Sequence, residues 1–383
     1  MTWITRCAAT ALVVIATAGP LRAADLLEEA VDFTGTILWI QTDVPGLVIG
    51  AVRGGESYVA GFGEFRDGSG TPPDGDTRMR IGSVTKVFTG AVLASMVADG
   101  TVDLTARVDA YLDWDVTLPT MDGHYLRLID LATRAGGLPR EIQHNGGTPE
   151  DPYADITRER FIQNLEDDPL MFPPGTGVFY SNFGFDLLAQ TLQAAAGQPY
   201  ETLLEERVLK PAGMTATTFN LTDEQRESAF QGHNIDGSPM PFVPSAEIMR
   251  GSGSLHSTAN DLLAWMKWHL DRFGENEAEM RMIDHATYLG RDGLSPIYGM
   301  DESGHMDGLG LGWIVMNPEG TRPRILQKAG GRQGIFTYFA FAPDHGVGVF
   351  AAMNEFSFGG TVAMNAAMNE LIDQLSLPLP TYP

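Results

Sequence analysis

Hydrophobic residues follow a strand-like pattern near both ends of the chain. Residues 45–65, PGLVIGAVRGGESYVAGFGEF, contain two apolar runs around Gly54-Gly55 and predict a β-hairpin. Beyond residue 308, the segments GLGWIVM, RILQ, IFTYFAFAP and GVGVFAAMN alternate or run apolar, and turn residues such as those at 343–346 separate them. These patterns predict strands contributed by both ends of the chain.

The middle of the chain has the apolar spacing of helices instead. Residues 83–100 place apolar side chains at helical intervals before Gly100, which is a typical helix end. Residues 180–197 and 257–273 are the other clear helical segments of this region, and a last helix is expected over residues 361–375. Long loops rich in Gly, Pro and Asp join the helical segments of the middle.

Together these elements predict an α+β fold. An antiparallel β-sheet would be built from both chain ends and flanked by helices, with an inserted mainly helical region. We expect one domain over residues 24–383, with an α/β part at about 24–90 and 308–383 and a mainly helical part at about 91–307.

The first 23 residues have the features of a secretory signal peptide. MTWITRCAATALVVIATAGPLRA has a positive charge at Arg6, an apolar stretch too short to span a bilayer, and a small residue, Ala23, where cleavage can occur. A membrane anchor or a buried N-terminal helix is the alternative. The only cysteine, Cys7, lies here, so the mature chain would have neither disulfides nor thiolate chemistry. We expect an exported, periplasmic protein with no integral membrane segment in its mature form.

The chain is strongly acidic, with a formal net charge of −24 at pH 7. Loss of residues 1–23 would remove two arginines and no acid, which changes the net charge to −26. Charge of this sign argues against nucleic acid and anionic membrane surfaces as partners. It also makes any local cluster of positive charge more informative, because only four residues of the chain are lysines.

Several common catalytic motifs are absent from the sequence. It has no G-x-S-x-G elbow, no P-loop, and no G-x-G-x-x-G between a strand and a helix. The eight histidines are scattered without the spacing of metal ligands, so we expect no metal site and no cofactor. None of them lies in a stretch that suggests a Ser-His-Asp triad.

Ser83-Val84-Thr85-Lys86 opens the helix predicted over residues 83–100. The N–H of Ser83 would be one of the unpaired donors at the helix start, where the helix dipole favours developing negative charge. Lys86 projects from the same face one turn later, and a buried lysine of lowered pKa can take the proton of a serine hydroxyl. The alternative is a serine N-cap followed by an exposed lysine.

Tyr180-Ser181-Asn182 lies where the loop PPGTG, residues 173–177, leads into the next helix. The tyrosine and the asparagine can face one cleft. A phenol can relay protons if a cation such as Lys86 lowers its pKa, and a carboxamide can both donate to and accept from a substrate amide. The alternative is a helix N-terminus that Ser181 or Asn182 caps.

The run ILQKAGGRQGIF, residues 325–336, places one of the four lysines after a strand-like segment. Glycines in the stretch Lys328-Ala329-Gly330-Gly331 let a ligand approach the backbone closely. An N–H of this stretch can pair with that of Ser83 to form an oxyanion hole, and Lys328 can attract a substrate carboxylate. The alternative is a solvated lysine in a turn.

In this order, the three segments resemble the motifs S-x-x-K, Y-x-N and K-T-G or H-x-G of the serine β-lactamase and penicillin-binding protein family. This family comprises class C β-lactamases, low-molecular-mass penicillin-binding peptidases and related esterases. Further likeness in LATRAGGLPRE, PGTGVFYSNFGFDLLA, GSGSLHSTANDLLAWM and LGLGWIVM extends the resemblance over essentially the whole mature chain. Within the family, the lysine of the third motif resembles that of AmpH-type D-alanyl-D-alanine carboxypeptidase/endopeptidases.

The resemblance implies a catalytic role for three residues. Ser83 would be the acylated nucleophile, Lys86 its proton partner, and Tyr180 the general base and acid. The N–H groups of Ser83 and Gly331 would form the oxyanion hole.

The same resemblance implies how the substrate is bound. Asn182 would orient the substrate amide, and Lys328 would assist proton placement and bind the substrate carboxylate, next to Gly330. Ala329 stands where the family usually has threonine, so one hydroxyl that would contact the carboxylate is missing. Either Arg332 replaces that contact or the enzyme does not require a free carboxylate.

The sequence therefore predicts an exported serine hydrolase that forms an acyl-enzyme on Ser83 and uses no cofactor. The expected substrates are peptidoglycan peptides, at the D-Ala-D-Ala end or at the cross-link. A class C-type β-lactamase, an esterase of the same fold, and a penicillin- or muropeptide-binding sensor without turnover are the alternatives.

Overall fold

The computed structural model describes residues 23–148, 150–167 and 169–378. The expected signal peptide lies outside these residues except for Ala23, where the first helix, α1 (Ala23–Thr42), begins. Within the described ranges, no helix is both long and apolar enough to cross a membrane.

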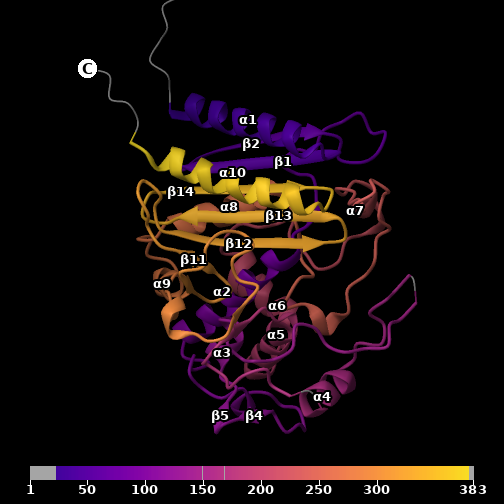
Figure 1. The fold of residues 1–383 in the computed structure, drawn as a ribbon, viewed down its shortest axis with the longest axis vertical. Coiled ribbons are helices and arrows are strands. Elements are labelled where there is room, and N and C mark those ends of the chain that lie inside the picture. The colour runs from indigo at the N-terminus through magenta and orange to yellow at the C-terminus, as the bar shows by residue number, and fades with distance from the viewer. Residues whose placement is uncertain (1–22, 149, 168, 379–383) are drawn as a thin grey trace, which may run out of the picture.

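An eight-stranded antiparallel sheet forms the centre of the described part of the chain (Figure 1). The strand order is β2-β1-β14-β13-β12-β11-β10-β8, so strands from the two chain ends pair directly, β1 beside β14. The strands are β1 (Gly46–Arg53), β2 (Glu56–Gly63), β8 (Leu289–Gly290), β10 (Gly308–Leu309), β11 (Ile314–Met316), β12 (Ile325–Arg332), β13 (Ile335–Ala342) and β14 (Val347–Met353).

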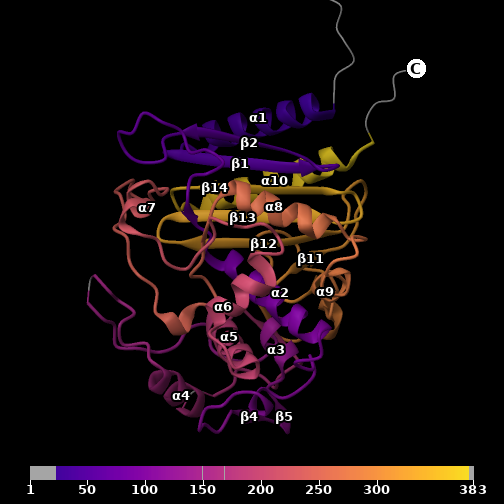
Figure 2. The same ribbon diagram turned by 180° about the vertical axis from the view of Figure 1, so that it is seen from behind.

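Helices cover both faces of this sheet. On one face, α1 and α10 (Phe358–Ser376) pack against β1, β13 and β14 (Figure 1). On the other face lie α8 (Ala259–Leu270) and α2 (Thr85–Ala98), as Figure 2 shows. Side chains alternate along a strand, so Tyr338 of β13 packs into the hydrophobic core on the α1 and α10 face, while Phe339 and Phe341 pack into the core on the α2 and α8 face. Burial on both faces explains why β13 reads as a continuous apolar run.

Most of the remaining elements form a helical region beside the β12 side of the sheet, in the lower half of Figure 1. Its α5 begins after Ser181, whose Oγ accepts a hydrogen bond from the N–H of Gly184. The helices outside the two layers are α3 (Leu128–Ala132), α4 (Arg158–Asp167), α5 (Asn182–Ala196), α6 (Tyr200–Leu204), α7 (Asp223–Glu227) and α9 (Ala278–Asp284). The short strands are β3 (Met79–Arg80), β4 (Thr120–Met121), β5 (His124–Tyr125), β6 (Val178–Phe179), β7 (His256–Ser257) and β9 (Ile297–Tyr298).

The predicted α+β fold with an antiparallel sheet is confirmed. The hairpin around Gly54-Gly55 is also confirmed, with both glycines at positive φ. The strand predicted to end near Gln327 is longer than expected. β12 continues to Arg332 because it pairs with β13 as far as Ile335, through a tight turn in which Gln333 and Gly334 have positive φ.

Candidate active site

Ser83 lies in a short 3-10 turn, Gly82–Val84, that leads directly into α2. Two glycines allow this turn to lie against β12. A Cβ at Gly82, whose φ is +50°, would lie 2.7 Å from the backbone N of Gly331. A Cβ at Gly330 would lie 2.3 Å from the carbonyl oxygen of Ile81 and 2.9 Å from the N of Ser83. The nucleophile candidate is therefore held next to the strand that carries the glycine-rich run.

Lys86 lies one helical turn beyond Ser83 and is completely buried. Its Nζ donates to Ser83 Oγ at 3.3 Å, to Asn182 Oδ1 at 2.5 Å and to the carbonyl oxygen of Ser252 at 2.7 Å. Burial lowers the pKa of Lys86, and the nearby Tyr180 partly opposes this shift. The exposed lysine of the alternative interpretation is excluded, because all three ammonium protons point at protein acceptors.

Tyr180 immediately precedes the cap of α5 and is surrounded by cations. The Nζ atoms of Lys86 and Lys328 lie 4.9 and 5.3 Å from the centre of its ring, and the guanidinium carbons of Arg134 and Arg140 lie 5.7 and 4.7 Å from it. Burial alone would raise the pKa of Tyr180. The charges of Lys328, Lys86 and Arg134, with a hydrogen bond from Ser83, outweigh burial and lower that pKa to about 7. Tyr180 can therefore exchange a proton near neutral pH.

Lys328 is a buried residue within β12, and its Nζ donates to the carbonyl oxygen of Ala329. Burial, with the charges of Arg134 and Lys86, lowers the pKa of Lys328 to about 8. The solvated turn lysine of the alternative interpretation is thereby excluded.

Asn182 is the first residue of α5, and its carboxamide has one possible orientation. Lys86 can only donate a hydrogen bond, so it faces Oδ1 of Asn182. The Glu141 carboxylate can only accept one, so it faces Nδ2 of Asn182 at 2.5 Å. The N–H of Asn182 also donates to the carbonyl oxygen of Arg140 at 2.8 Å, which fixes the loop that carries Glu141. Sequence reasoning about single residues missed Glu141. The signal available for it was its place in the segment LATRAGGLPRE.

Sequence reasoning also missed two further buried charged residues near Lys86. Arg134 is fully buried and donates to the carbonyl oxygen of Gly312 at 2.5 Å. Asp186, one turn beyond Asn182 in α5, accepts from Ser252 Oγ at 2.9 Å. Burial raises the pKa of Asp186 to about 7, although Lys86 acts in the opposite direction. No local pattern distinguishes such residues from surface charges, because only the tertiary fold brings them together.

A cleft of 1020 Å³ joins the three predicted segments. Ser83, Tyr180 and the whole stretch from Lys328 to Arg332 line it, and so do residues 299–305 and the start of α10. Arg332 reaches the cleft, but its Nη2 donates to Ser245 Oγ at 3.0 Å, and its guanidinium lies 5.1 Å from the centre of the Tyr153 ring. The Arg332 guanidinium is therefore already bound to protein groups and does not replace the hydroxyl that Ala329 lacks.

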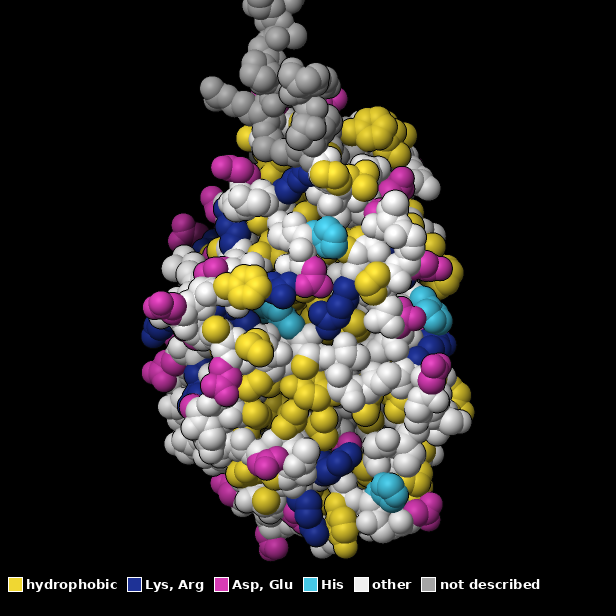
Figure 3. All heavy atoms as spheres, turned by 90° about the vertical axis from the view of Figure 1, so that its left-hand side faces the viewer, with side chains coloured by type: hydrophobic (Ala, Val, Ile, Leu, Met, Phe, Trp, Pro, Cys, Tyr) yellow, Lys and Arg dark blue, Asp and Glu magenta, His cyan; other side chains and the backbone are white. Residues whose placement is uncertain are grey.

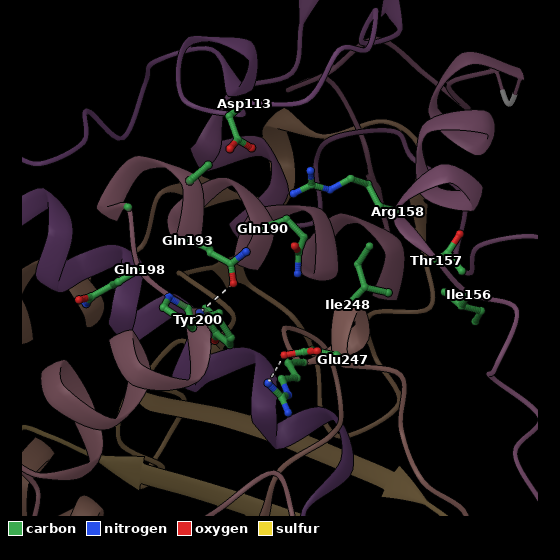
Figure 4. Close-up of a pocket in the computed structure, with 14 residues that line it drawn as sticks. Asp113, Ile156, Thr157, Arg158, Gln190, Gln193, Gln198, Tyr200, Glu247 and Ile248 are labelled. Atoms are coloured by element: carbon green, nitrogen blue, oxygen red, sulfur yellow. Dashed lines mark hydrogen bonds and ion pairs between the residues drawn. The ribbon is translucent and has the colours of Figure 1, made fainter.

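A second cavity, of 750 Å³, lies among α4, α5, α6 and residues 247–250 (Figure 4). It contains none of the residues predicted for the site. Part of its polar lining is already paired: Gln193 Oε1 accepts from the N–H of Tyr200, and Arg250 forms an ion pair with Glu247. The surface beyond these cavities offers no single charged face in the view of Figure 3, where acidic and basic side chains are interspersed. We therefore take the cleft beside Ser83 as the candidate active site.

The geometry of this cleft is suited to acyl transfer. A serine at a helix start is hydrogen-bonded to a tyrosine of near-neutral pKa and to a buried lysine, and backbone N–H groups lie next to it. The fold and the site thus define a serine hydrolase.

The chain belongs to the beta-lactamase family, whose model matches residues 23–372. It is 32% identical to the D-alanyl-D-alanine-carboxypeptidase/endopeptidase AmpH of Escherichia coli, over 97% of this chain and 94% of that protein. It is 25% identical to a beta-lactamase of Pseudomonas fluorescens, over 86% of this chain and 94% of that protein.

A solved structure agrees with these relatives. The beta-lactamase/D-alanine carboxypeptidase of Yersinia pestis, complexed with citrate, superposes with a TM-score of 0.83 at 31% identity. The match covers 92% of this chain and 99% of that one. The resemblance inferred from the three motifs is confirmed.

Proposed function

We propose that this protein is an exported, periplasmic D-alanyl-D-alanine carboxypeptidase/endopeptidase that acts on peptidoglycan peptides through an acyl-enzyme on Ser83. The observation that carries the proposal is the position of Tyr180, which is hydrogen-bonded to Ser83 and flanked by the ammonium groups of Lys86 and Lys328. Similarity to the AmpH and Yersinia pestis proteins supports the peptide substrate.

In the acylation step, the Tyr180 phenolate takes the proton of the Ser83 hydroxyl as its oxygen attacks the substrate carbonyl carbon. The N–H groups of Ser83 and Gly331 stabilise the oxyanion that forms. When this intermediate collapses, the C–N bond breaks and Tyr180 returns its proton to the leaving amine. The acyl group then remains on Ser83 as an ester.

In the deacylation step, Tyr180 takes a proton from water, and the resulting hydroxide attacks the ester carbon. The Ser83 oxygen leaves with the proton that Tyr180 returns, so the enzyme is regenerated and a carboxylic acid is released. Lys86 stabilises Tyr180 each time it returns to the phenolate form, while Asn182, fixed by Glu141, binds the amide of the acyl group.

The leaving-group side of the cleft favours the endopeptidase reaction over the carboxypeptidase reaction. Ala329 offers no hydroxyl, and Arg332 is bound to Ser245 rather than free in the cleft. The cleft continues to the start of α10, where the exposed side chains of Phe356 and Phe358 give it an apolar wall. A chain that continues beyond the scissile bond, as in a cross-link, therefore fits better than a chain that ends there.

The same wall favours a second candidate function, hydrolysis of esters with apolar leaving groups. Phe356 and Phe358 line the cleft, and an ester alcohol needs no carboxylate contact at Ala329. Ester hydrolysis uses the same acyl-enzyme on Ser83, so the two functions differ in the leaving group alone.

Parallel assays distinguish these functions. Purified protein would be incubated with a cross-linked muropeptide, an uncross-linked pentapeptide muropeptide, a chromogenic cephalosporin and a p-nitrophenyl ester. We expect fastest release from the cross-linked muropeptide and labelling of Ser83 by a fluorescent penicillin, with neither in Ser83→Ala. Ester turnover without any peptide release would replace the peptidase proposal by the esterase. Rapid turnover of the cephalosporin with no peptide release would instead favour a β-lactamase.

A further inference from the structure

Two histidines and an aspartate form a buried cluster outside the cleft. His269 lies in the last turn of α8, Asp284 is the last residue of α9, and His285 follows it directly. His269 and Asp284 are completely buried, and His285 is partly buried. The reaction proposed for Ser83 uses none of these groups, and none of them lines the cleft.

The three ligand-type atoms lie at the spacing of a metal site. Nδ1 of His269 is 2.9 Å from Nε2 of His285 and 3.8 Å from Oδ2 of Asp284, and all three atoms lie within 4.8 Å of one another. The third side of this triangle is at most 4.8 Å, and at that limit the point equidistant from the three atoms lies about 2.4 Å from each, a few tenths of an ångström beyond the bond lengths of zinc to imidazole and carboxylate. A metal ion would thus need only small side-chain movements.

The cluster also contains buried polar atoms that lack partners in the described part of the chain. Asp284 Oδ2 accepts from the indole N–H of Trp313 at 2.9 Å, but Asp284 Oδ1 and His269 Nε2 have no hydrogen-bond partner. A buried carboxylate oxygen without a partner is costly, and an ion is one of the few explanations for it. Asp284 Oδ1 is therefore a candidate fourth ligand atom for a metal ion.

The charge states of the cluster agree with ligand roles for both histidines. Burial, together with the charge of Arg324, lowers the pKa of His285 to about 3, and burial lowers the pKa of His269 well below its usual value. Both imidazoles are therefore uncharged, but the hydrogen bond between Nδ1 of His269 and Nε2 of His285 requires a proton on one of these nitrogens, and metal binding would displace that proton. Burial raises the pKa of Asp284 to about 8, so a metal ion would displace at most one proton there.

The surrounding arginines limit the charge that the cluster can hold. Arg324 donates to the carbonyl oxygen of His285 at 2.6 Å, Arg281 donates to that of Gly274 at 2.8 Å, and Arg272 pairs with Asp344. Their positive charge opposes a cation. The Asp284 carboxylate, once ionised, offsets half of the charge of a divalent ion at direct contact, where the attraction is strongest.

We propose that His269, Asp284 and His285 bind one divalent transition-metal ion, with Zn²⁺ the best match to two imidazoles and a carboxylate. The ion would join the end of α8 to the end of α9 behind β13, where the His269 ring stacks on Phe341 at 4.8 Å between centroids. Its role would be structural. The histidine spacing predicted no metal site, because 14 residues separate His269 from Asp284 and only the fold brings them together.

The test measures metal content and stability rather than activity. The whole protein, purified without a chelator and dialysed, would be analysed for zinc by mass spectrometry and then stripped and reloaded with Zn²⁺ or Co²⁺. We expect about one equivalent of zinc per chain, a visible Co²⁺ spectrum, and a melting temperature several degrees higher with Zn²⁺ than after stripping. Asp284→Asn and His285→Gln should each lose the bound metal and the thermal shift.

His305→Ala is the matched control. His305 also lies near two carboxylates, with ring nitrogens 3.6 Å from Asp301 and 3.6 Å from Asp307, but it is exposed. This variant should keep the zinc and the shift. Wild-type protein that retains no zinc and melts at the same temperature with and without Zn²⁺ would overturn the proposal, in favour of a hydrogen-bonded histidine pair beside a protonated Asp284. Loss of the metal in His305→Ala alone would overturn it too. If Asp284→Asn does not fold, His285→Gln, whose side chain is less buried, still decides the question.

Discussion

The charge of Lys328 should control the pH at which the enzyme becomes active. Lys328→Met removes the ammonium group while keeping an unbranched side chain of similar length in the buried position within β12. Nζ of Lys328 lies 5.3 Å from the centre of the Tyr180 ring, and its charge is the largest influence that lowers the pKa of Tyr180. At an effective dielectric constant of about 20, this distance corresponds to about 3 kcal/mol, or about 2 pKa units.

The sign of the effect follows from the role proposed for Tyr180. The phenolate is the active form, so the rate rises as pH increases through the pKa of Tyr180, which is about 7. Without the Lys328 charge this pKa rises, and the rising limb of kcat/KM against pH should move upward by about 1 to 2 units. At pH 7 the acylation rate should fall about 5- to 50-fold, and at high pH it should recover most of this loss.

The assay is the pH profile of p-nitrophenyl acetate hydrolysis, with penicillin acylation as a second readout. An ester without a carboxylate isolates the effect on Tyr180 from any loss of carboxylate binding. Lys210→Met is the control, because Lys210 is exposed and pairs with Glu205, so its profile should match that of the wild type. A Lys328→Met profile that is lower at every pH but not displaced would refute the reasoning and restrict Lys328 to substrate binding.

Three further changes test the site. Ala329→Thr restores the missing hydroxyl and should raise kcat/KM for an uncross-linked pentapeptide several-fold, while leaving the cross-linked substrate unchanged; equal effects on both, measured by chromatography, would contradict the leaving-group argument. Gly330→Ala places a Cβ 2.3 Å from the carbonyl oxygen of Ile81, so urea unfolding should show a loss of about 2 kcal/mol. Glu141→Ala releases the Asn182 carboxamide and should slow acylation by amide substrates about tenfold. A similar loss with p-nitrophenyl acetate, which has no acyl amide, would argue against that role for Glu141.

The parts of the fold that were predictable from the sequence are those with a strong local pattern. The hairpin around Gly54-Gly55 and the helices that begin near Ser83 and Ser181 were recognisable, because apolar periodicity and turn or cap residues agree there. The extent of β12 was not, since Ala329, Gly330 and Gly331 have weak strand propensity and are held in the strand by pairing with β13.

The candidate site shows the same division. Motifs and the scarcity of lysine singled out five residues: Ser83, Lys86, Tyr180, Asn182 and Lys328. The structure brings them together, because Ser83, Tyr180 and Lys328 line one cleft and Lys86 is hydrogen-bonded to both Ser83 and Asn182. The charged residues that contact them lie outside the three motifs. Arg134 and Glu141 read as ordinary charged residues in a loop, and their roles depend on contacts that only the folded chain creates.

The concentration of cations around Tyr180 in this acidic protein couples the titration of two lysines and a tyrosine. The negative charge of the Tyr180 phenolate opposes the lowering of the pKa of Lys86 and Lys328 by burial, and each ammonium group lowers the pKa of Tyr180. Because these groups are so close, their protons leave in steps that belong to the cluster rather than to one residue. A protonated lysine pair with an ionised tyrosine is therefore favoured, and it combines a base for the Ser83 proton with the charge that keeps that base ionised. Removing either lysine should impair proton transfer even where the serine and the tyrosine remain in place.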